Sequence, residues 1–248
     1  MRYQRGAGCA APDSLVACAG PGRRASPRCR LQGNLIQLIF YYGSGSPYAW
    51  RVWLALEHKG IEYELRTMSF SAGDLRRPEF RAVNPRGKVP AITDDGFALY
   101  ESVAIVEYLD EQYGGPRLFP LDARARARVR RLVQEADQYY AVAMDGLTDE
   151  VLFKPQDQWE QARIDAARES LVQELAMWER LITGPWLAGD AVSAADFTLY
   201  PLIALTLRMQ KRKPDLDLRA GIGPVLGAWM QRVEALPLLS KTWPPHWK

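Results

Sequence analysis

The chain has 248 residues, of which 48% are hydrophobic and 25% are charged, a composition typical of a globular protein with a well-buried core. No apolar run approaches the roughly 20 residues that cross a bilayer as a helix, so we expect no membrane partner. The formal charge is +3, but residues 1–34 hold six arginines against one aspartate. The rest of the chain is therefore slightly acidic, which argues against a nucleic-acid partner.

Residues 1–34 differ from everything that follows. They are rich in Gly, Ala, Pro, Ser and Arg, lack helical or strand periodicity, and contain all three cysteines, Cys9, Cys18 and Cys29. The odd number and the spacing argue against a disulfide framework or a zinc motif, and with only two histidines in the chain we expect no metal site. A transit-like peptide and a secretory signal around "SLVACAG" are two interpretations, but we favour a disordered extension.

The folded part opens with a strand, a helix and a second strand. "NLIQLIFYY" is rich in β-branched and aromatic residues and predicts a strand. "PYAWRVWLALEHKG" predicts a helix, with Pro47 at the first helical position and Gly60 as the C-terminal cap. "IEYELRTMSF" alternates apolar and polar residues, which predicts another strand. Short joints between these elements indicate a parallel, right-handed crossover unit.

A hairpin and a helix complete this small domain. "KVPAIT" and "FALY" flank Asp95–Gly96, a pair typical of a tight turn. "ESVAIVEYLDEQYGG" follows as a helix, with Ser102 as the expected N-cap. We therefore assign residues 35–113 to a small α/β domain and residues 114–121, "GGPRLFPL", to a linker.

Residues 122–248 have long helix-forming runs and predict an all-α domain that ends in the tail "WPPHWK". Ser193 and Asp196 have the spacing of a capping box, and a structural role in folding is expected for both. Three aromatic residues belong either to the core or to a pocket: Tyr139, Tyr140 and Trp159. A basic run has a solvated helix face as its default interpretation and a partner subunit as the alternative: Arg124, Arg126, Arg128, Arg130 and Arg131.

Four segments, taken in this order and spacing, resemble the cytosolic glutathione S-transferase superfamily: "SPYAWRVWLALEHKGIEYE", "NPRGKVPAI", "LYESVAIVEYLDE" and "LAGDAVSAADFTLYP". The resemblance covers residues 35–243 and is most similar to serine-type classes such as zeta or theta. It implies a thioredoxin-like α/β N-terminal domain, an all-α C-terminal domain, a homodimer and a cytoplasmic location. It also implies glutathione as a co-substrate, with no tightly bound cofactor.

Ser46 has both a structural and a chemical interpretation. A serine before Pro47 is a good helix N-cap, worth about 1 kcal/mol. The same position lies at the positive end of the helix dipole, where a hydroxyl can stabilise the thiolate of glutathione. The resemblance implies this catalytic role for Ser46. Ser44 is the nearest alternative, and Tyr42 a weaker one.

The resemblance also implies how glutathione is held. Val89–Pro90 would be a cis bond that turns the main chain of Val89 toward the cysteinyl part of the ligand. Ser102 would bind the γ-glutamyl carboxylate and Glu101 would face the ammonium group. Lys88 would contact a carboxylate, although an exposed lysine in a loop more often has no specific partner.

Two functions follow from these residues. The first is an enzyme that adds the sulfur of glutathione to a small, hydrophobic electrophile, by conjugation, isomerisation or peroxide reduction. Because residues 35–248 contain no cysteine, a mixed-disulfide mechanism is disfavoured. The second is a non-catalytic interaction or regulatory module that keeps the fold and binds glutathione as a ligand. No motif in the helical domain identifies the electrophile.

Overall fold

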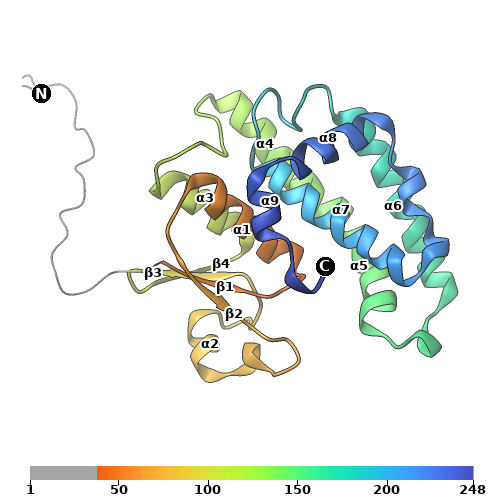
Figure 1. Ribbon diagram of the computed structural model, residues 1–248, viewed down its shortest axis with the longest axis horizontal. Helices are drawn as coiled ribbons and strands as arrows, with labels where there is room; N and C mark the ends of the chain where they lie inside the picture. The colour runs from red at the N-terminus through yellow and green to blue at the C-terminus, as the bar shows by residue number, and fades with distance from the viewer. Residues whose placement is uncertain (1–37, 248) are drawn as a thin grey trace, which may run out of the picture. The chain divides into compact units, whose positions relative to one another are not determined.

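Figure 1 shows the computed structural model, which describes residues 38–247. The extension predicted for residues 1–34 lies outside the described residues. No helix in the described part of the chain is long and apolar enough to cross a membrane.

The first part of the described chain is a four-stranded sheet in the order β2-β1-β3-β4. Its strands are β1 Ile39–Tyr42, β2 Glu64–Thr67, β3 Ala91–Asp94 and β4 Phe97–Tyr100. β1 pairs in parallel with β2, and β3 lies antiparallel to both β1 and β4. The predicted crossover and the predicted hairpin at Asp95–Gly96 are therefore confirmed, and Gly96 has a φ of 80° in the turn.

Three helices cover this sheet: α1 Pro47–Lys59, α2 Pro78–Val83 and α3 Ser102–Gln112. α1 and α3 lie on the face toward the helical part, and α2 lies on the opposite face (Figure 1). α2 is a short helix that the polar sequence around it did not reveal. The assignment of Ser102 as N-cap was wrong, because Glu101 is the N-cap residue, at a φ of 72°, and Ser102 is the first helical residue.

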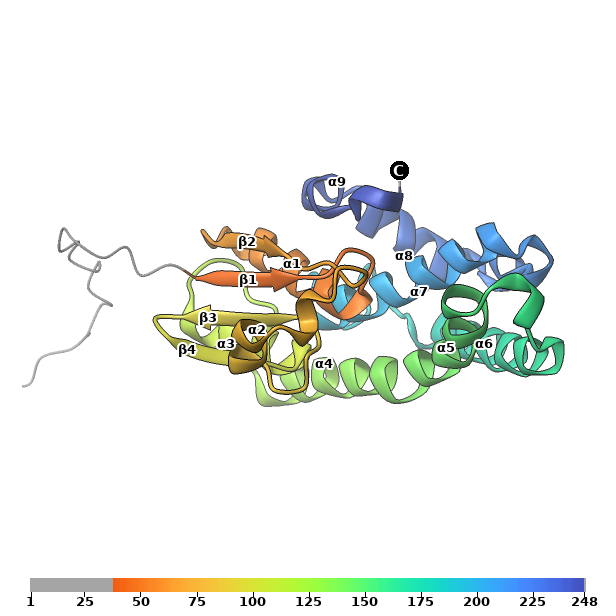
Figure 2. The same cartoon turned by 90° about the horizontal axis from the view of Figure 1, so that it is seen from below.

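The remainder is helical, which confirms the predicted all-α part. Its helices are α4 Ala123–Glu135, α5 Ala141–Thr148, α6 Gln161–Leu181, α7 Ala194–Arg212, α8 Pro224–Glu234 and α9 Pro237–Thr242. The π-helical turn Ala136–Tyr140 joins α4 to α5, and a second π-helical turn, Asp149–Phe153, follows α5. Figure 2 shows α4 and α5 along their length. Short 3₁₀ turns occupy Asp74–Arg76, Gln156–Gln158, Pro214–Leu216, Leu218–Gly221 and Pro245–Trp247. The domain limits at residues 113, 121 and 122 stay predictions.

α1 joins the two parts because it packs against α3 on one side and against α7 and α9 on the other. The guanidinium of Arg51, in α1, makes two hydrogen bonds at 2.7 and 2.5 Å to the carboxylate of Asp137 in the first π-helical turn. The side chain of Arg51 is only 1% exposed. A buried charge is stable only when it is paired, so this contact ties the α/β part to the helical part.

The C-terminal segment also packs onto α1, where the sequence predicted only a tail. The indole N–H of Trp50 donates to the hydroxyl of Thr242 at 3.0 Å. The ring of Trp50 has edge contacts with Trp243 and Trp247, at centroid distances of 5.3 and 5.5 Å. Thr242 and Trp247 are buried, so the C-terminal segment is part of the core around α1, whose N-cap is Ser46.

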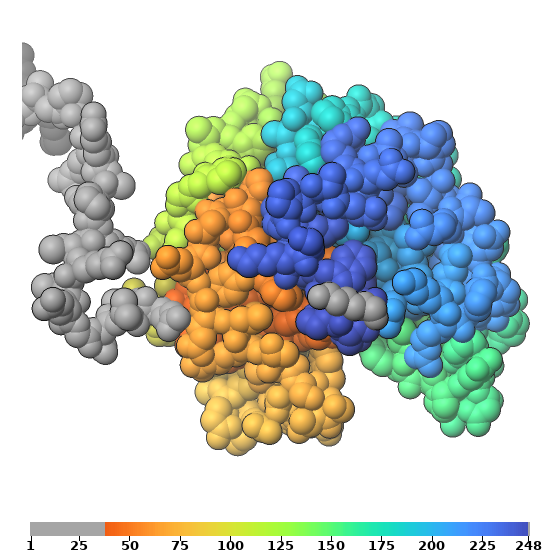
Figure 3. Space-filling view, in the orientation of Figure 1, coloured from red at the N-terminus to blue at the C-terminus, as the bar shows by residue number. Residues whose placement is uncertain are grey.

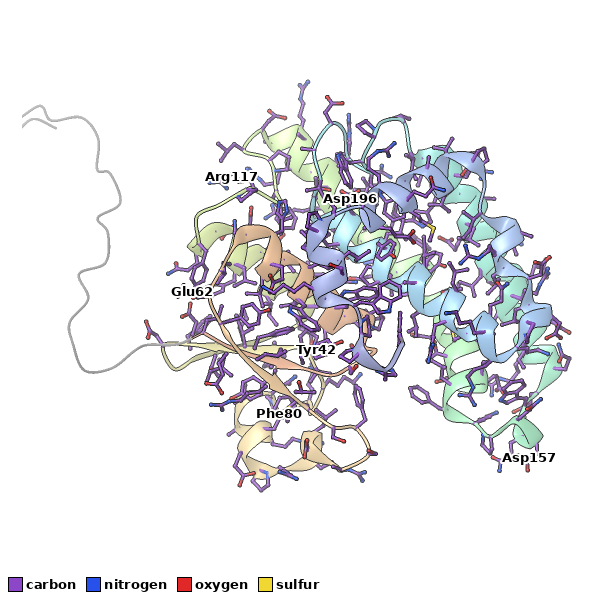
Figure 4. All side chains as sticks on the ribbon, in the orientation of Figure 1. Tyr42, Glu62, Phe80, Arg117, Asp157 and Asp196 are labelled. Atoms are coloured by element: carbon purple, nitrogen blue, oxygen red, sulfur yellow. The ribbon has the colours of Figure 1, made fainter. Side chains whose placement is uncertain are left out.

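Asp196 is completely buried in the helical part and accepts four hydrogen bonds (Figure 4). Its donors are the main-chain N–H groups of Leu187 and Ser193, the Ser193 hydroxyl and the Trp229 indole, at 2.8 to 3.0 Å. The predicted capping box is confirmed, and the same carboxylate also binds the loop before α7 and the middle of α8.

We predict that Asp196→Ala lowers the free energy of unfolding by about 3 kcal/mol, or the melting temperature by about 10 °C, because buried donors lose their acceptor. Asp190→Ala is the matched control, since Asp190 is exposed in the loop before α7. Thermal unfolding should show a shift for Asp196→Ala only. Equal melting temperatures for the two variants would contradict the role of Asp196.

Candidate active site at the start of α1

Ser46 lies at the N-terminal end of α1, with extended backbone geometry and Pro47 as the first helical residue. Its hydroxyl oxygen accepts a hydrogen bond from the main-chain N–H of Ala49 at 3.2 Å. The structure thus confirms the N-cap interpretation. The hydroxyl proton has no acceptor within the described residues, so Ser46 keeps one donor for a ligand at the positive end of the helix.

The two glycines around Ser44 are required by close contacts. A Cβ at Gly43 would lie 2.6 Å from both the Phe70 ring and a methyl of Val89. Gly45 has a φ of 87°, and a Cβ there would lie 2.8 Å from the His246 ring. Only glycine fits at these positions, which explains why the sequence places "GSGS" immediately before the helix.

A cleft of about 820 Å³ opens in front of Ser46. Residues 44–48, together with Phe70, Leu75, Lys88 and Val89, form one wall. The helical wall consists of Met144, Asp145, Thr148, Leu152, Phe153, Leu205, Arg208, Lys211 and Arg212, and His246 and Trp247 form one end. In Figure 3 the hollow lies between the segment around residue 75 and the region around residue 150. This volume is typical of a small-molecule site.

The loop before β3 brings Lys88 and Val89 to the cleft. The bond between Val89 and Pro90 is cis, which confirms that expectation from the resemblance. The buried Asn84 holds the loop, since its amide donates to the Lys88 carbonyl at 2.6 Å and its side-chain oxygen accepts from Arg86 N at 3.0 Å. Asn84 therefore positions Lys88 and Val89, a role that sequence reasoning missed.

Glu101 and Ser102 lie next to this loop but are not among the residues that line the cleft. Because Ala91 is the register partner of Tyr100, the residues before β3 lie beside those after β4. Ser102 is buried at the first position of α3, whereas the carboxylate of Glu101 is exposed. The structure thus brings Ser46, Lys88 and Val89 to one cleft and leaves Glu101 and Ser102 at its margin.

The two alternatives to Ser46 have different surroundings. The Ser44 oxygen lies 2.7 Å from Nδ1 of His246, whose Nε2 accepts from the Trp247 indole at 3.0 Å. In the neutral ring Nδ1 then carries the proton, so Ser44 is the acceptor in its pair. Tyr42 is 1% exposed, does not line the cleft, and burial raises the pKa of its phenol. Its position in the sheet is labelled in Figure 4.

Sequence reasoning missed several residues of the cleft. His246 and Trp247 were taken for a tail, although two tryptophans in "WPPHWK" are a signal for packing. Phe153 lies in the second π-helical turn and is 76% exposed at the cleft. Phe70 is 53% exposed on the opposite wall. No sequence pattern distinguishes these two phenylalanines from core residues.

None of the three aromatic residues left open from the sequence lines this cleft. Tyr140 is fully buried and donates to Thr206 at 3.2 Å, so it belongs to the core. Tyr139 is exposed, and Trp159 lies half-buried beside Lys213. The basic run lies on α4, where Arg130 pairs with Glu107 at 2.7 Å. Within residues 38–247 no cluster of His, Cys, Asp or Glu is arranged to hold a metal ion.

Two titratable side chains shape the electrostatics of the cleft. The pKa of Tyr48 is raised to about 12 by burial and by Asp145 and Asp137, although the Arg51 guanidinium beneath its ring lowers it. Burial and Asp149 raise the pKa of Asp145, and Lys88 lowers it. The Tyr48 phenol therefore remains protonated at neutral pH.

Comparison with known proteins identifies the class. The family pattern "Glutathione S-transferase, N-terminal domain" matches residues 45–112, and "Glutathione S-transferase, C-terminal domain" matches residues 161–232. Together these matches include the Ser46 segment, the Val89–Pro90 loop and the Asp196 capping box. The chain therefore belongs to the glutathione S-transferase superfamily, and its thioredoxin-like and helical parts form the fold of that family.

Individual relatives support the same assignment. Glutathione S-transferase 4 of Zea mays is 35% identical over 79% of this chain and 87% of that protein. Maleylacetoacetate isomerase of Mus musculus is 35% identical over 67% of this chain and 76% of that protein. The crystal structure of maleylacetoacetate isomerase from Methylobacterium extorquens AM1, with bound malonate and GSH, has a TM-score of 0.64 and 33% identity. It covers 83% of this chain and 96% of that one.

We predict that Tyr48 does not ionise below about pH 11, because its pKa is raised to about 12. Subtracting the phenolate absorbance of Tyr48→Phe from that of the unmodified protein during a pH titration isolates this residue. The difference should stay flat past pH 10, the ordinary value for tyrosine, and rise only above it. A step centred at or below pH 10 would contradict the burial and the acidic neighbours described for Tyr48.

Proposed function

We propose that the protein is a glutathione-dependent transferase in which Ser46 activates the thiol of glutathione. The observation that carries the proposal is the position of the Ser46 hydroxyl, which caps α1 and still has a proton to donate into the cleft. A thiolate placed there would accept this hydrogen bond and face the positive end of the helix dipole.

The proposed chemistry follows from the ionisation of the thiol. A free thiol has a pKa of about 8.5 and is mostly protonated at neutral pH, but the thiolate is the nucleophile. A hydrogen bond and a helix N-terminus both stabilise the anion and lower that pKa. The thiol releases its proton to solvent, and the thiolate sulfur then forms a bond to the electrophilic atom of the second substrate. In a substitution the leaving group departs with its bonding electron pair, and in an addition to a double bond the displaced electron pair takes up a proton from solvent.

The residues proposed to hold glutathione extend from the cleft toward the start of α3. The main chain of Val89, next to Pro90, would pair with the cysteinyl part, as an added strand does. Lys88 would contact one carboxylate. Ser102 and the N-terminus of α3 would bind the γ-glutamyl carboxylate, and Glu101 would face the ammonium group. The relative from Methylobacterium extorquens AM1, with GSH bound, supports glutathione as the ligand.

The same proposal includes a homodimer, a role in detoxification and a cytoplasmic location, all from the resemblance to the family. The sequence disfavours a mixed-disulfide reaction, because the described part of the chain contains no cysteine.

We predict that Ser46→Ala returns the pKa of bound glutathione toward its free value of about 8.5. Ser44→Ala is the matched control, since it removes a neighbouring hydroxyl of the same cleft that does not cap α1. The measurement is the ultraviolet absorbance of the bound thiolate as a function of pH, for both variants and the unmodified protein.

The outcomes separate the two functions that the sequence left open. A depressed thiol pKa that rises in Ser46→Ala and not in Ser44→Ala supports the enzyme with Ser46 as its activating group. Tight binding of glutathione without a thiolate signal would instead favour a non-catalytic binding module. The absence of any binding would refute glutathione as the ligand.

A further inference from the structure

Three cationic side chains on the last two turns of α7 line the cleft: Arg208, Lys211 and Arg212. Positions separated by three and four residues lie on the same face of a helix. This face is opposite the wall that carries Ser46 and Val89. We call these three residues the α7 cations.

The α7 cations have no acidic partner in the described part of the chain. One guanidinium nitrogen of Arg208 donates to the main-chain oxygen of His246 at 3.2 Å, and one of Arg212 donates to the Leu152 oxygen at 3.3 Å. These contacts with neutral oxygens orient the two guanidinium groups but do not offset their charge. Within residues 38–247 none of the three forms a salt bridge, whereas the neighbouring Lys213 pairs with Asp215.

The other residues of the cleft do not balance this charge either. Of the described residues that line the cleft, Asp145 is the only carboxylate. The positive charge of Lys88, across the cleft, acts on Asp145 and lowers its pKa. One acidic and one basic group thus offset each other, and the charge of the α7 cations remains.

Apart from Asp145 and Thr148, the rest of the helical wall is apolar. Phe153 follows Leu152, whose main-chain oxygen accepts from Arg212, and is 76% exposed, while Phe70, on the other wall, is 53% exposed. Met144 and Leu205 form the buried part of the helical wall. Large apolar side chains that face a cleft gain free energy when a ligand removes them from water. The two exposed phenylalanines therefore favour a ligand with an apolar body.

We propose that the second substrate is an apolar electrophile that carries an anionic group, a carboxylate or a sulfonate, bound by the α7 cations. This inference rests on the proposed function, which supplies the sulfur nucleophile at Ser46. The carboxylates of glutathione are assigned to Lys88 and Ser102 on the thioredoxin-like side. The α7 cations are thus available to the second substrate, and charge-assisted hydrogen bonds to its anion would also orient the electrophilic atom.

Two dyes that differ by one anionic group test the proposal without requiring a reaction. 8-Anilinonaphthalene-1-sulfonate carries a sulfonate, and N-phenyl-1-naphthylamine is the same ring system without it. Their binding is measured by fluorescence in the presence of S-methylglutathione, which cannot form a thiolate. Lys211→Gln with Arg212→Gln should weaken the sulfonate dye about tenfold, the effect of one charge-assisted hydrogen bond, and leave the neutral dye unchanged.

The matched control is Arg124→Gln with Arg128→Gln, which removes the same charge from the exposed surface of α4. This control should change neither dye, and both double variants should keep the melting temperature of the unmodified protein. An equal effect on the two dyes, no effect on either, or an equal loss of the sulfonate dye in the α4 control would each overturn the proposal. So would failure of the sulfonate dye to bind the unmodified protein.

The proposed function is tested separately by the thiolate absorbance of bound glutathione. A missing thiolate signal would refute the activation of glutathione, while the dye result would still decide whether the cleft binds an anion. A normal thiolate signal with no differential effect on the dyes would refute only the inference about the second substrate.

Discussion

The structure depends on α1 being held on both sides at once. One side packs on the α/β part, and the other is bound to the helical part by the ion pair between the buried Arg51 and Asp137, whose side chain is 23% exposed. Removing one partner of a buried ion pair typically costs about 3–5 kcal/mol, because the remaining charge is buried without a partner and is not solvated. The pair and the tryptophan contacts of Trp50 therefore fix where α1 begins and where its N-terminus points.

The candidate site follows from that constraint. Arg51 also lies beneath the ring of Tyr48, at 5.3 Å from its centroid, so the ion pair positions one wall of the cleft. Ser46 lies two residues before Tyr48 in the chain and caps the same helix, α1. The Ser46 hydroxyl can thus cap the helix and donate a hydrogen bond to the proposed thiolate at the same time. Its oxygen accepts from the main-chain N–H of Ala49, and its proton remains available. The cap that stabilises the helix uses the oxygen of this hydroxyl, and the proposed chemistry uses its hydrogen.

Local patterns in the sequence were sufficient for the elements whose cause is local. Pro47 and Gly60 predicted the ends of α1, and Ser193 with Asp196 predicted the capping box, because caps depend on residues a few positions apart. The four matching segments predicted the family, and with it the cis bond before Pro90. Ser102 was misassigned as a cap because the positive φ of Glu101 is unusual for a residue with a side chain.

Features that depend on distant contacts could not be predicted in the same way. The role of His246 requires the C-terminal segment to fold back on Gly45, 201 positions earlier in the chain. The local sequence of that segment, "WPPHWK", shows only an enrichment in Pro and Trp. Phe153 faces the cleft through a π-helical turn, and a single extra residue in a helical turn leaves no clear mark on apolar periodicity. The α7 cations were not predicted as part of the site, because charged residues at the end of a helix usually face solvent.

The central claim is that the sulfur of glutathione lies against the Ser46 hydroxyl at the start of α1. A crystal structure of the complex with glutathione tests it most directly, because the position of the sulfur distinguishes the competing hydroxyls. The account predicts the sulfur within hydrogen-bond distance of Ser46 Oγ, with the main chain of Val89 paired to the cysteinyl residue. A sulfur bound at Ser44, or one that contacts neither serine, would contradict it.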